Sequence, residues 1–348
     1  MQPNEAANEL ECRKERLDFM EYPLYRVVQV IYTLLSLLSL PLLLYVQIKY
    51  ISGTTFHWNL KIILFLYYSL ALLHSTAYLS IQIYTITSSL VSKPCDFFPP
   101  PYLYASLHLC IIVSGFGMTF TLAAMGSERI VATIRSNKYE RNGITLGLFL
   151  FVLTVTGLVA AVCYVYDIDD FDVRVLSMTN VPPASSSRFN RVAVLNTTIG
   201  IVCIVMFHVS YRISKKQCSV SITTLTSRYQ TRENVITTQF ATHIATLQVT
   251  FFVFYGAGSI LTRVFDQQFF LTNKKLYISL RHIFYVIPIF SIVLPTYSIY
   301  RLKCYRILRD RNIQSIIMMK SQGAAGSRNY EEVIARSWQH DQHREIHN

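Results

Sequence analysis

The stretch that decides the fold runs from Leu107 to Glu140 and reads LHLCIIVSGFGMTFTLAAMGSERIVATIRSNKYE. It opens with roughly twenty residues that carry no formal charge, enough to cross a lipid bilayer as one helix. The uncharged part ends at the pair Glu128-Arg129, and a basic segment follows. This pattern predicts a membrane helix whose charged end lies at one surface of the bilayer.

The composition extends this prediction to the whole chain. The 348 residues are 52% hydrophobic and only 15% charged, whereas soluble proteins usually carry about 25% charged residues. The mean hydropathy is +0.33. A formal net charge of +12 is also found in nucleic-acid-binding proteins, but here the basic residues lie between apolar blocks and not on one face or motif. We therefore expect several membrane spans and no nucleic-acid partner.

The apolar residues form seven blocks that are each long enough for one span. The blocks cover approximately residues 25–48, 59–86, 102–134, 144–166, 191–211, 236–263 and 276–300. Backbone polar groups in lipid must be satisfied within each segment, so we expect an all-α bundle of seven transmembrane helices. Pro41 is expected to kink the first helix.

The basic residues between the blocks predict the orientation. One set of loops and the tail holds most of them: Arg135, Lys138, Arg141, Arg212, Lys215, Lys216, Arg228, Arg232, Arg301, Lys303, Arg306, Arg309 and Arg311. The opposite loops hold fewer: Lys93, Arg174, Arg188, Lys274 and Lys275. The positive-inside rule then places the N-terminus outside the cell. We expect an extracellular segment 1–24, a seven-span domain 25–302 and a cytoplasmic tail 303–348.

Several motifs resemble those of one receptor superfamily. They are Glu128-Arg129-Ile130-Val131-Ala132-Thr133 with Tyr139-Glu140, Phe56-His57-Trp58-Asn59-Leu60-Lys61, Pro94-Cys95-Asp96, and Leu225-Thr226-Ser227-Arg228-Tyr229-Gln230 with Glu233-Asn234. Together they resemble the nematode serpentine chemoreceptors of the alpha superfamily. The tail, with Gly323, Gly326, Asn329-Tyr330 and Trp338, is similar to the alpha/beta class. The start of the first span, Tyr22-Pro23-Leu24-Tyr25-Arg26, resembles the beta class equally well.

This resemblance implies a rhodopsin-like G-protein-coupled receptor. It would lie in the plasma membrane of sensory neurons, bind a small-molecule chemosensory ligand in the outer half of the bundle and signal to heterotrimeric G proteins. The alternatives are a seven-helix ligand-gated channel subunit with inverted topology, or a transporter. The charge distribution argues against the channel, and the lack of paired broken spans argues against the transporter. The sequence contains no visible nucleophile–base arrangement, so we do not expect an enzyme, and we expect no cofactor.

Arg129 is the strongest candidate for a conformational switch. A guanidinium at the inner end of a helix can pair with Glu128 or with other helix ends, and then release to contact a G protein. The simpler alternative is an interfacial anchor. The resemblance adds Arg228, Tyr229 and Tyr297 as candidate residues for G-protein coupling or switching.

Ionisable residues inside the spans suggest a ligand site, because they tend to face the interior of a bundle. Arg281 and His108 are expected in the outer parts of the seventh and third spans. His282 adjoins Arg281, and the aromatic walls are predicted to be Tyr104, Tyr255 and Tyr285. For any one histidine, the alternative is a core residue hydrogen-bonded to a neighbouring helix.

Acidic and histidine residues give no metal site. Asp167, Asp169, Asp170 and Asp172 crowd the second outer loop without an EF-hand pattern, so we expect a solvated acidic rim. The histidines within the spans share no HxxxH spacing.

Mammalian rhodopsin-like receptors usually have a cysteine in the second outer loop. In this chain the corresponding residues 167–191 contain no cysteine. Cys12 and Cys95 are predicted to form an outer disulfide, with Cys163 as the alternative partner of Cys95.

Beyond the seventh span, residues 303–319 interleave apolar and basic side chains, which fits an amphipathic helix on the inner leaflet. Cys304 beside it is a candidate palmitoylation site.

Overall fold

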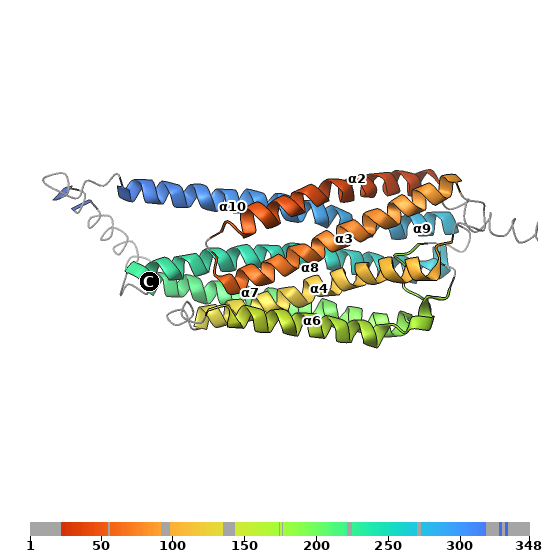
Figure 1. Ribbon diagram of the computed structural model, residues 1–348, viewed down its shortest axis with the longest axis horizontal. Helices are drawn as coiled ribbons and strands as arrows, with labels where there is room; N and C mark the ends of the chain where they lie inside the picture. The colour runs from red at the N-terminus through yellow and green to blue at the C-terminus, as the bar shows by residue number, and fades with distance from the viewer. Residues whose placement is uncertain are drawn as a thin grey trace, which may run out of the picture. The chain divides into compact units, whose positions relative to one another are not determined.

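The computed structural model describes residues 22–54, 56–91, 98–134, 143–173, 175, 177–220, 225–269, 273–317, 327, 328, 331 and 332. In this part of the chain all regular structure is helical (Figure 1). Seven helices are long and apolar enough to cross a membrane. They are Pro23–Ile51, Trp58–Leu90, Pro101–Ile134, Thr145–Val165, Ser186–Gln217, Arg232–Thr262 and Lys275–Ile307. The predicted all-α seven-span bundle is confirmed.

The helices of the first six spans follow the predicted apolar blocks, and all but α6 extend beyond them. They are α2 (Pro23–Tyr45), α3 (Trp58–Val91), α4 (Pro101–Ile134), α6 (Thr145–Val165), α7 (Ser186–Val220) and α8 (Leu225–Phe269). Pro41 lies inside α2, and the same span ends in a π-helical segment, η1 (Val46–Ile51). A short 3₁₀ turn, η3 (Ile168–Phe171), follows α6.

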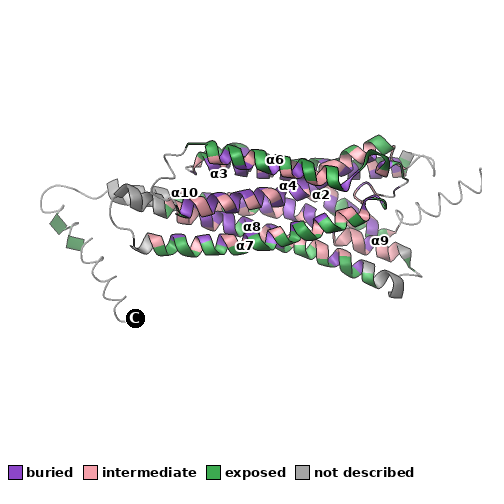
Figure 2. Ribbon diagram, turned by 90° about the horizontal axis from the view of Figure 1, so that it is seen from below, coloured by how far each residue is buried: buried purple, intermediate pink, exposed green. Residues whose placement is uncertain are grey.

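Helix α4 is the central helix of the bundle. It packs against α3, α6, α7 and α8, and 67% of its most apolar window is buried, against 22% for the fourth span. Figure 2 shows α4 mostly in the buried colour, whereas α6 and α7 carry long exposed stripes. A helix with partners all round positions its polar groups in the protein interior, whereas outer helices present apolar side chains to lipid.

Close packing also joins α3 to α6 through a glycine. The backbone N–H of Gly147 donates to the Asn59 side chain at 3.0 Å. A Cβ added at Gly147 would lie 2.6 Å from the Cα of Asn59. Only a residue without a side chain permits this approach, so Gly147 fixes the spacing of the two helices.

The seventh span differs from the single helix expected for residues 276–300. It consists of α9 (Lys274–Ile283) and α10 (Ile287–Ile317), with non-helical residues between them. Pro288 lies in the first turn of α10, where its missing N–H costs no intrahelical hydrogen bond. A Cβ added at Gly258 of α8 would lie 2.3 Å from Phe284, so this glycine makes room for the break.

Helix α10 continues beyond the seventh block to Ile317. The segment expected to form a separate amphipathic helix is thus helical up to that residue, but continuous with the span. By compactness the chain divides into residues 1–297 and 298–348. The location of the second part on the inner leaflet stays a prediction, as do the domain limits at 24 and 302.

Candidate functional site

An ion pair lies in the bundle interior near the end of α4. Arg129 donates from Nε and Nη2 to the two carboxylate oxygens of Glu128, both at 2.5 Å. The two side chains are 1% and 0% exposed. Nη1 of the same guanidinium donates to the hydroxyl of Thr237 on α8 at 2.7 Å. Arg129 therefore connects α4 to α8 through a charge that is paired where it is desolvated.

The next turn of α4 connects to α7. The hydroxyl of Thr133 donates to the carbonyl of Arg129 at 2.8 Å. Since its hydrogen is used there, it accepts from the hydroxyl of Ser214, 3.1 Å away on α7. Gln217 of α7 donates to the carbonyl of Thr133 at 3.3 Å. The Arg129 end of α4 is thus hydrogen-bonded to both α7 and α8.

The remaining switch candidates lie on α8 and α10. Arg228 and Tyr229 belong to α8, and their side chains fall outside the described part of the structure. Tyr297 lies on α10, and its ring centre is 6.0 Å from that of His243 on α8. Their roles in G-protein coupling stay predictions.

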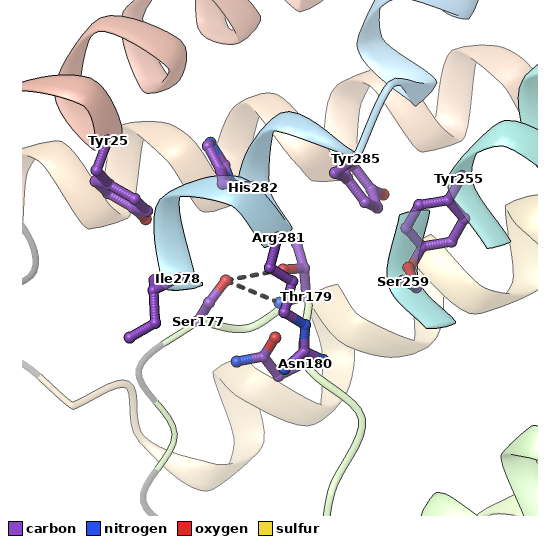
Figure 3. Close-up of a pocket in the computed structure, with 10 residues that line it drawn as sticks. All are labelled: Tyr25, Ser177, Thr179, Asn180, Tyr255, Ser259, Ile278, Arg281, His282 and Tyr285. Atoms are coloured by element: carbon purple, nitrogen blue, oxygen red, sulfur yellow. Dashed lines mark hydrogen bonds between the residues drawn. The ribbon is translucent and has the colours of Figure 1, made fainter. Parts of the chain in front are cut away.

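At the opposite end of the bundle, a cavity of ≈ 90 Å³ lies between α2, α8, α9 and the loop that joins α6 to α7 (Figure 3). It is lined by Tyr25, Ser177, Thr179, Asn180, Tyr255, Ser259, Ile278, Arg281, His282 and Tyr285. Four of the six predicted ligand-site residues are in this set, while Tyr104 and His108 are not. The sequence patterns missed the loop residues, which come from a stretch without periodicity or motif.

The break between α9 and α10 places Tyr285 at the base of this cavity. Its hydroxyl lies 3.0 Å from Nε2 of His74, and Nδ1 of His74 lies 2.9 Å from the hydroxyl of Ser114. The ring centres of Tyr255 and Tyr285 are 5.3 Å apart in an edge-to-face arrangement. His74 is therefore a core histidine with both ring nitrogens bonded, and Tyr285 is fixed in position by it.

Two polar groups of α9 are open to partners in the cavity. Within the described residues Arg281 makes no ion pair and no hydrogen bond. Figure 3 shows Arg281 between α9 and the loop residues Ser177, Thr179 and Asn180. Nε2 of His282 is buried without a hydrogen-bond partner there, while its ring packs on Tyr25 with 5.0 Å between ring centres. The cavity thus combines aromatic walls with one positive charge.

Tyr104 and His108 are hydrogen-bonded to the loop that lines this cavity. The Tyr104 hydroxyl donates to the carbonyl of Asn180 at 2.7 Å. His108 bonds through Nδ1 to the carbonyl of Met178 at 2.9 Å, and through Nε2 to the hydroxyl of Tyr166 at 2.8 Å. Because a carbonyl only accepts, we assign the hydrogen to Nδ1, and Nε2 then accepts from Tyr166. We call these two residues and their three bonds the loop clamp.

The acidic loop is more strongly paired than a solvated rim. Arg188 donates to Asp167 at 2.6 Å and to Asp170 at 2.9 Å. The Asp170 carboxylate also accepts from the backbone N–H of Asp167 and from the hydroxyl of Ser185. The backbone bond from Asp167, the bond from Ser185 and the charge of Arg188 lower the pKa of Asp170 below its usual 3.8, against the opposing effect of burial.

The cysteine predictions remain open. Cys12 and Cys95 lie outside the described residues. Cys163 is exposed and carries a free thiol. The thiol of Cys304 is also free and is partly exposed on α10, so palmitoylation there stays a prediction.

Comparison with known proteins assigns the family. The family described as serpentine type 7TM GPCR receptor class ab chemoreceptor matches residues 12–339. Serpentine receptor class beta-16 of Caenorhabditis elegans is 28% identical over 320 residues, which cover 90% of this chain and 92% of that protein. Serpentine receptor class beta-17 of the same organism is 25% identical, over 91% of this chain and 88% of that protein. Both classes that the motifs indicated are represented, and the chain belongs to the serpentine seven-transmembrane chemoreceptor family of class ab.

Proposed function

We propose that this chemoreceptor binds a small molecule in the cavity beside Arg281 and signals to heterotrimeric G proteins from the end that holds Arg129. The cavity end then faces outside, together with the N-terminus, and the Arg129 end faces the cytoplasm. The basic loops support this orientation through the positive-inside rule. The family description as a chemoreceptor supports a location in the plasma membrane of sensory neurons.

The observation that carries the proposal is the bond from Arg129 to Thr237. It joins α4 to α8 inside the bundle, and Arg129 is 1% exposed. An interfacial anchor extends its charge to the membrane surface, so this burial favours the switch interpretation. A bond between two helices can be made in one state and broken in the other. A ligand that binds the broken state more tightly then shifts the population.

Arg281 indicates what kind of ligand the cavity accepts. A cation without an acidic partner in the described structure favours a molecule that carries an anionic group. The tyrosine walls favour an apolar or aromatic body on the same molecule. The cavity is small, which fits a small compound or one part of a larger one.

The test of signalling uses the full chain in cells with a reporter of G-protein dissociation. Small volatile and water-soluble compounds, including carboxylates, are screened for an agonist. Arg129→Ala is expected to abolish the agonist response, whereas Arg188→Ala, which removes an ion-paired arginine at the other end, retains it. Both variants are compared at matched surface levels. A normal response from Arg129→Ala would refute the switch and leave the anchor interpretation.

The test of the ligand site uses the agonist found in that screen. Arg281→Ala is expected to weaken agonist potency by about tenfold or more, because a charge-assisted hydrogen bond is lost. Arg281→Lys keeps the charge and is expected to recover part of the potency. Unchanged potency with a lower folding yield would show that Arg281 has a structural role.

Orientation is tested separately with an epitope tag at Met1. Staining of intact cells is the expected result. Staining only after permeabilisation would contradict the receptor topology and favour a channel subunit with inverted orientation.

A further inference from the structure

The short helix α9 carries Arg281 and His282, which both line the cavity described above. It has 10 residues, Lys274–Ile283, and isolated helices of fewer than about 12 residues are marginally stable in water. It packs against α2 and α8. The position of the Arg281 guanidinium therefore depends on the contacts by which these neighbours hold α9.

One face of α2 packs on the end of α9. Tyr25 and Tyr32 are seven residues apart, about two helical turns, so they lie on the same face of α2. Both are buried, and their ring centres lie 5.0 and 5.7 Å from that of His282. Figure 3 shows Tyr25 of α2 beside His282 of α9. These aromatic contacts hold the side chain that adjoins Arg281 in the sequence.

Tyr32 also makes a hydrogen bond that the break in the seventh span requires. Its hydroxyl donates to the backbone carbonyl of Ile283 at 2.6 Å. This carbonyl is one of the last four of α9, which have no N–H partner within their own helix. In an unbroken helix it would accept from the N–H of Ile287, where α10 begins instead. Tyr32 thus supplies from α2 the donor that the break removes.

The residues that follow α9 are anchored separately. Tyr285 lies in the break, and its hydroxyl is 3.0 Å from Nε2 of His74 on α3. The ring of Tyr285 also stacks on that of Tyr78 of α3, with 5.2 Å between ring centres. Loss of the bond to Ile283 would therefore release α9 while Tyr285 stays attached to α3.

We propose that Tyr32 is a positioning residue of the ligand site, because its bond to Ile283 holds α9 so that the guanidinium of Arg281 meets the anionic group of the ligand. The inference rests on the proposed binding of an anionic ligand at Arg281. Tyr32 is not among the residues that line the cavity in the described part of the chain. It acts through α9 and not by contact with the ligand.

The first test needs no ligand. It measures hydrogen–deuterium exchange of the backbone amides in the full chain, in phosphatidylcholine nanodiscs. Tyr32→Phe keeps the ring and removes only the hydroxyl. We expect the amides of α9 to exchange about tenfold faster in this variant, because α9 then opens without breaking the bond to Tyr32. The amides of α3 and α4 should exchange as in the unmodified chain.

A matched control removes a hydroxyl that makes no such bond. Tyr67 is buried, and its hydroxyl oxygen has no hydrogen-bond partner among the described residues. Tyr67→Phe should therefore leave the exchange of α9 unchanged. Unchanged exchange of α9 in Tyr32→Phe, or an equal rise in all helices of that variant, would overturn the proposal.

The second test adds phenylacetate, a carboxylate with an aromatic body, as the probe. Phenylacetate is expected to slow the exchange of α9 in the unmodified chain. Tyr32→Phe should need about tenfold more phenylacetate for half of this effect, because the cation is displaced. Phenylethanol has the same ring without the charge, so it should act alike on the two proteins.

The uncharged probe separates positioning of the cation from a general structural role. Equal weakening of phenylacetate and phenylethanol by Tyr32→Phe would overturn the positioning of Arg281. If phenylacetate has no effect on the unmodified chain, the anionic ligand of the proposed function is contradicted. The exchange of α9 without ligand then still decides whether Tyr32 holds this helix.

Discussion

Two arginine–carboxylate sites lie at opposite ends of the bundle, and their surroundings differ. Arg129 pairs with Glu128 where the two side chains are 1% and 0% exposed. Arg188 pairs with Asp167 and Asp170, where the arginine is 27% exposed and Asp167 is 67% exposed. The chemistry of the bonds is the same. The access of water is not.

The difference shows what each pair contributes. Removing two charges from water is costly, so a buried pair is rarely the most stable solution for a helix interior. At Arg188 water keeps the charges solvated, and salt screens their attraction. We infer that the Arg188 pairs orient a loop, whereas the buried Arg129 pair is maintained for the proposed switch.

Removing one partner of the inner pair should give the largest effect. Glu128→Ala leaves the Arg129 charge in the interior without its carboxylate, and a loss of about 3–5 kcal/mol of stability is expected. Thermal unfolding in detergent measures it. The control is the double variant Glu128→Leu, Arg129→Met, which removes both charges and should be less destabilised than Glu128→Ala. The comparison between the two ends fails if Glu128→Ala is no more destabilised than Arg188→Ala.

The loop clamp should give the next effect. His108→Phe keeps the ring shape but removes the bonds to Met178 and Tyr166, leaving buried polar groups unsatisfied at about 1–3 kcal/mol each. Agonist potency should fall as well, because the loop that lines the cavity loses its support. Tyr104→Phe breaks a single bond, to Asn180, and should have the smaller effect in both assays. The reverse order would show that His108 does not position the loop.

The lipid bilayer explains why the seven spans and Arg129 could be predicted from the sequence. The bilayer requires long apolar helices, so the seven spans follow directly from the apolar blocks. The sequence predicts Arg129 because a charge at the end of such a block stands out from its apolar neighbours. It does not predict the partner of Arg129, because Thr237 is 108 residues away and threonines are common in this chain's spans.

The cavity beside Arg281 shows what the sequence does not predict. Arg281, His282, Tyr255 and Tyr285 were predicted from residue type alone. Ser177, Thr179 and Asn180 were not, since a loop is positioned by its tertiary bonds and not by its own pattern. His108 illustrates both limits. Its location inside a span was visible in the sequence, but its bonds to the loop, to residues 58 and 70 positions away, were not.

Arg188→Ala tests the exposed end of the comparison and should have a smaller effect than either previous variant. The expected result is a slight fall in the unfolding temperature at low salt that disappears at about 1 M salt, where screening is effective within about 3 Å. Equal losses at low and high salt would show that Arg188 acts through packing.

The smallest effect should be a dependence on acidity. The pKa of Asp170 is lowered on folding, so its contribution is complete above its unfolded value of 3.8 and is lost as the pH falls through the lower, folded value. Stability of the wild type should therefore decline more steeply below this pH than that of Asp170→Asn. Parallel curves of stability against pH for the two proteins would show that Asp170 does not contribute to the acid dependence.

Glu128 and Arg129 are neighbours on one helix, so the acid travels with the base when α4 moves. In the proposed switch, separation of α4 from α8 leaves the ion pair intact and breaks the bond to Thr237. A hydrogen bond to a charged group contributes about 1.5–3 kcal/mol, which corresponds to a bias of about ten- to hundredfold towards the bonded state of the proposed switch. A hydrogen bond of this strength leaves a measurable population in which the bond from Arg129 to Thr237 is broken without agonist. The receptor should show basal activity, and Thr237→Val should raise the rate of agonist-independent nucleotide exchange.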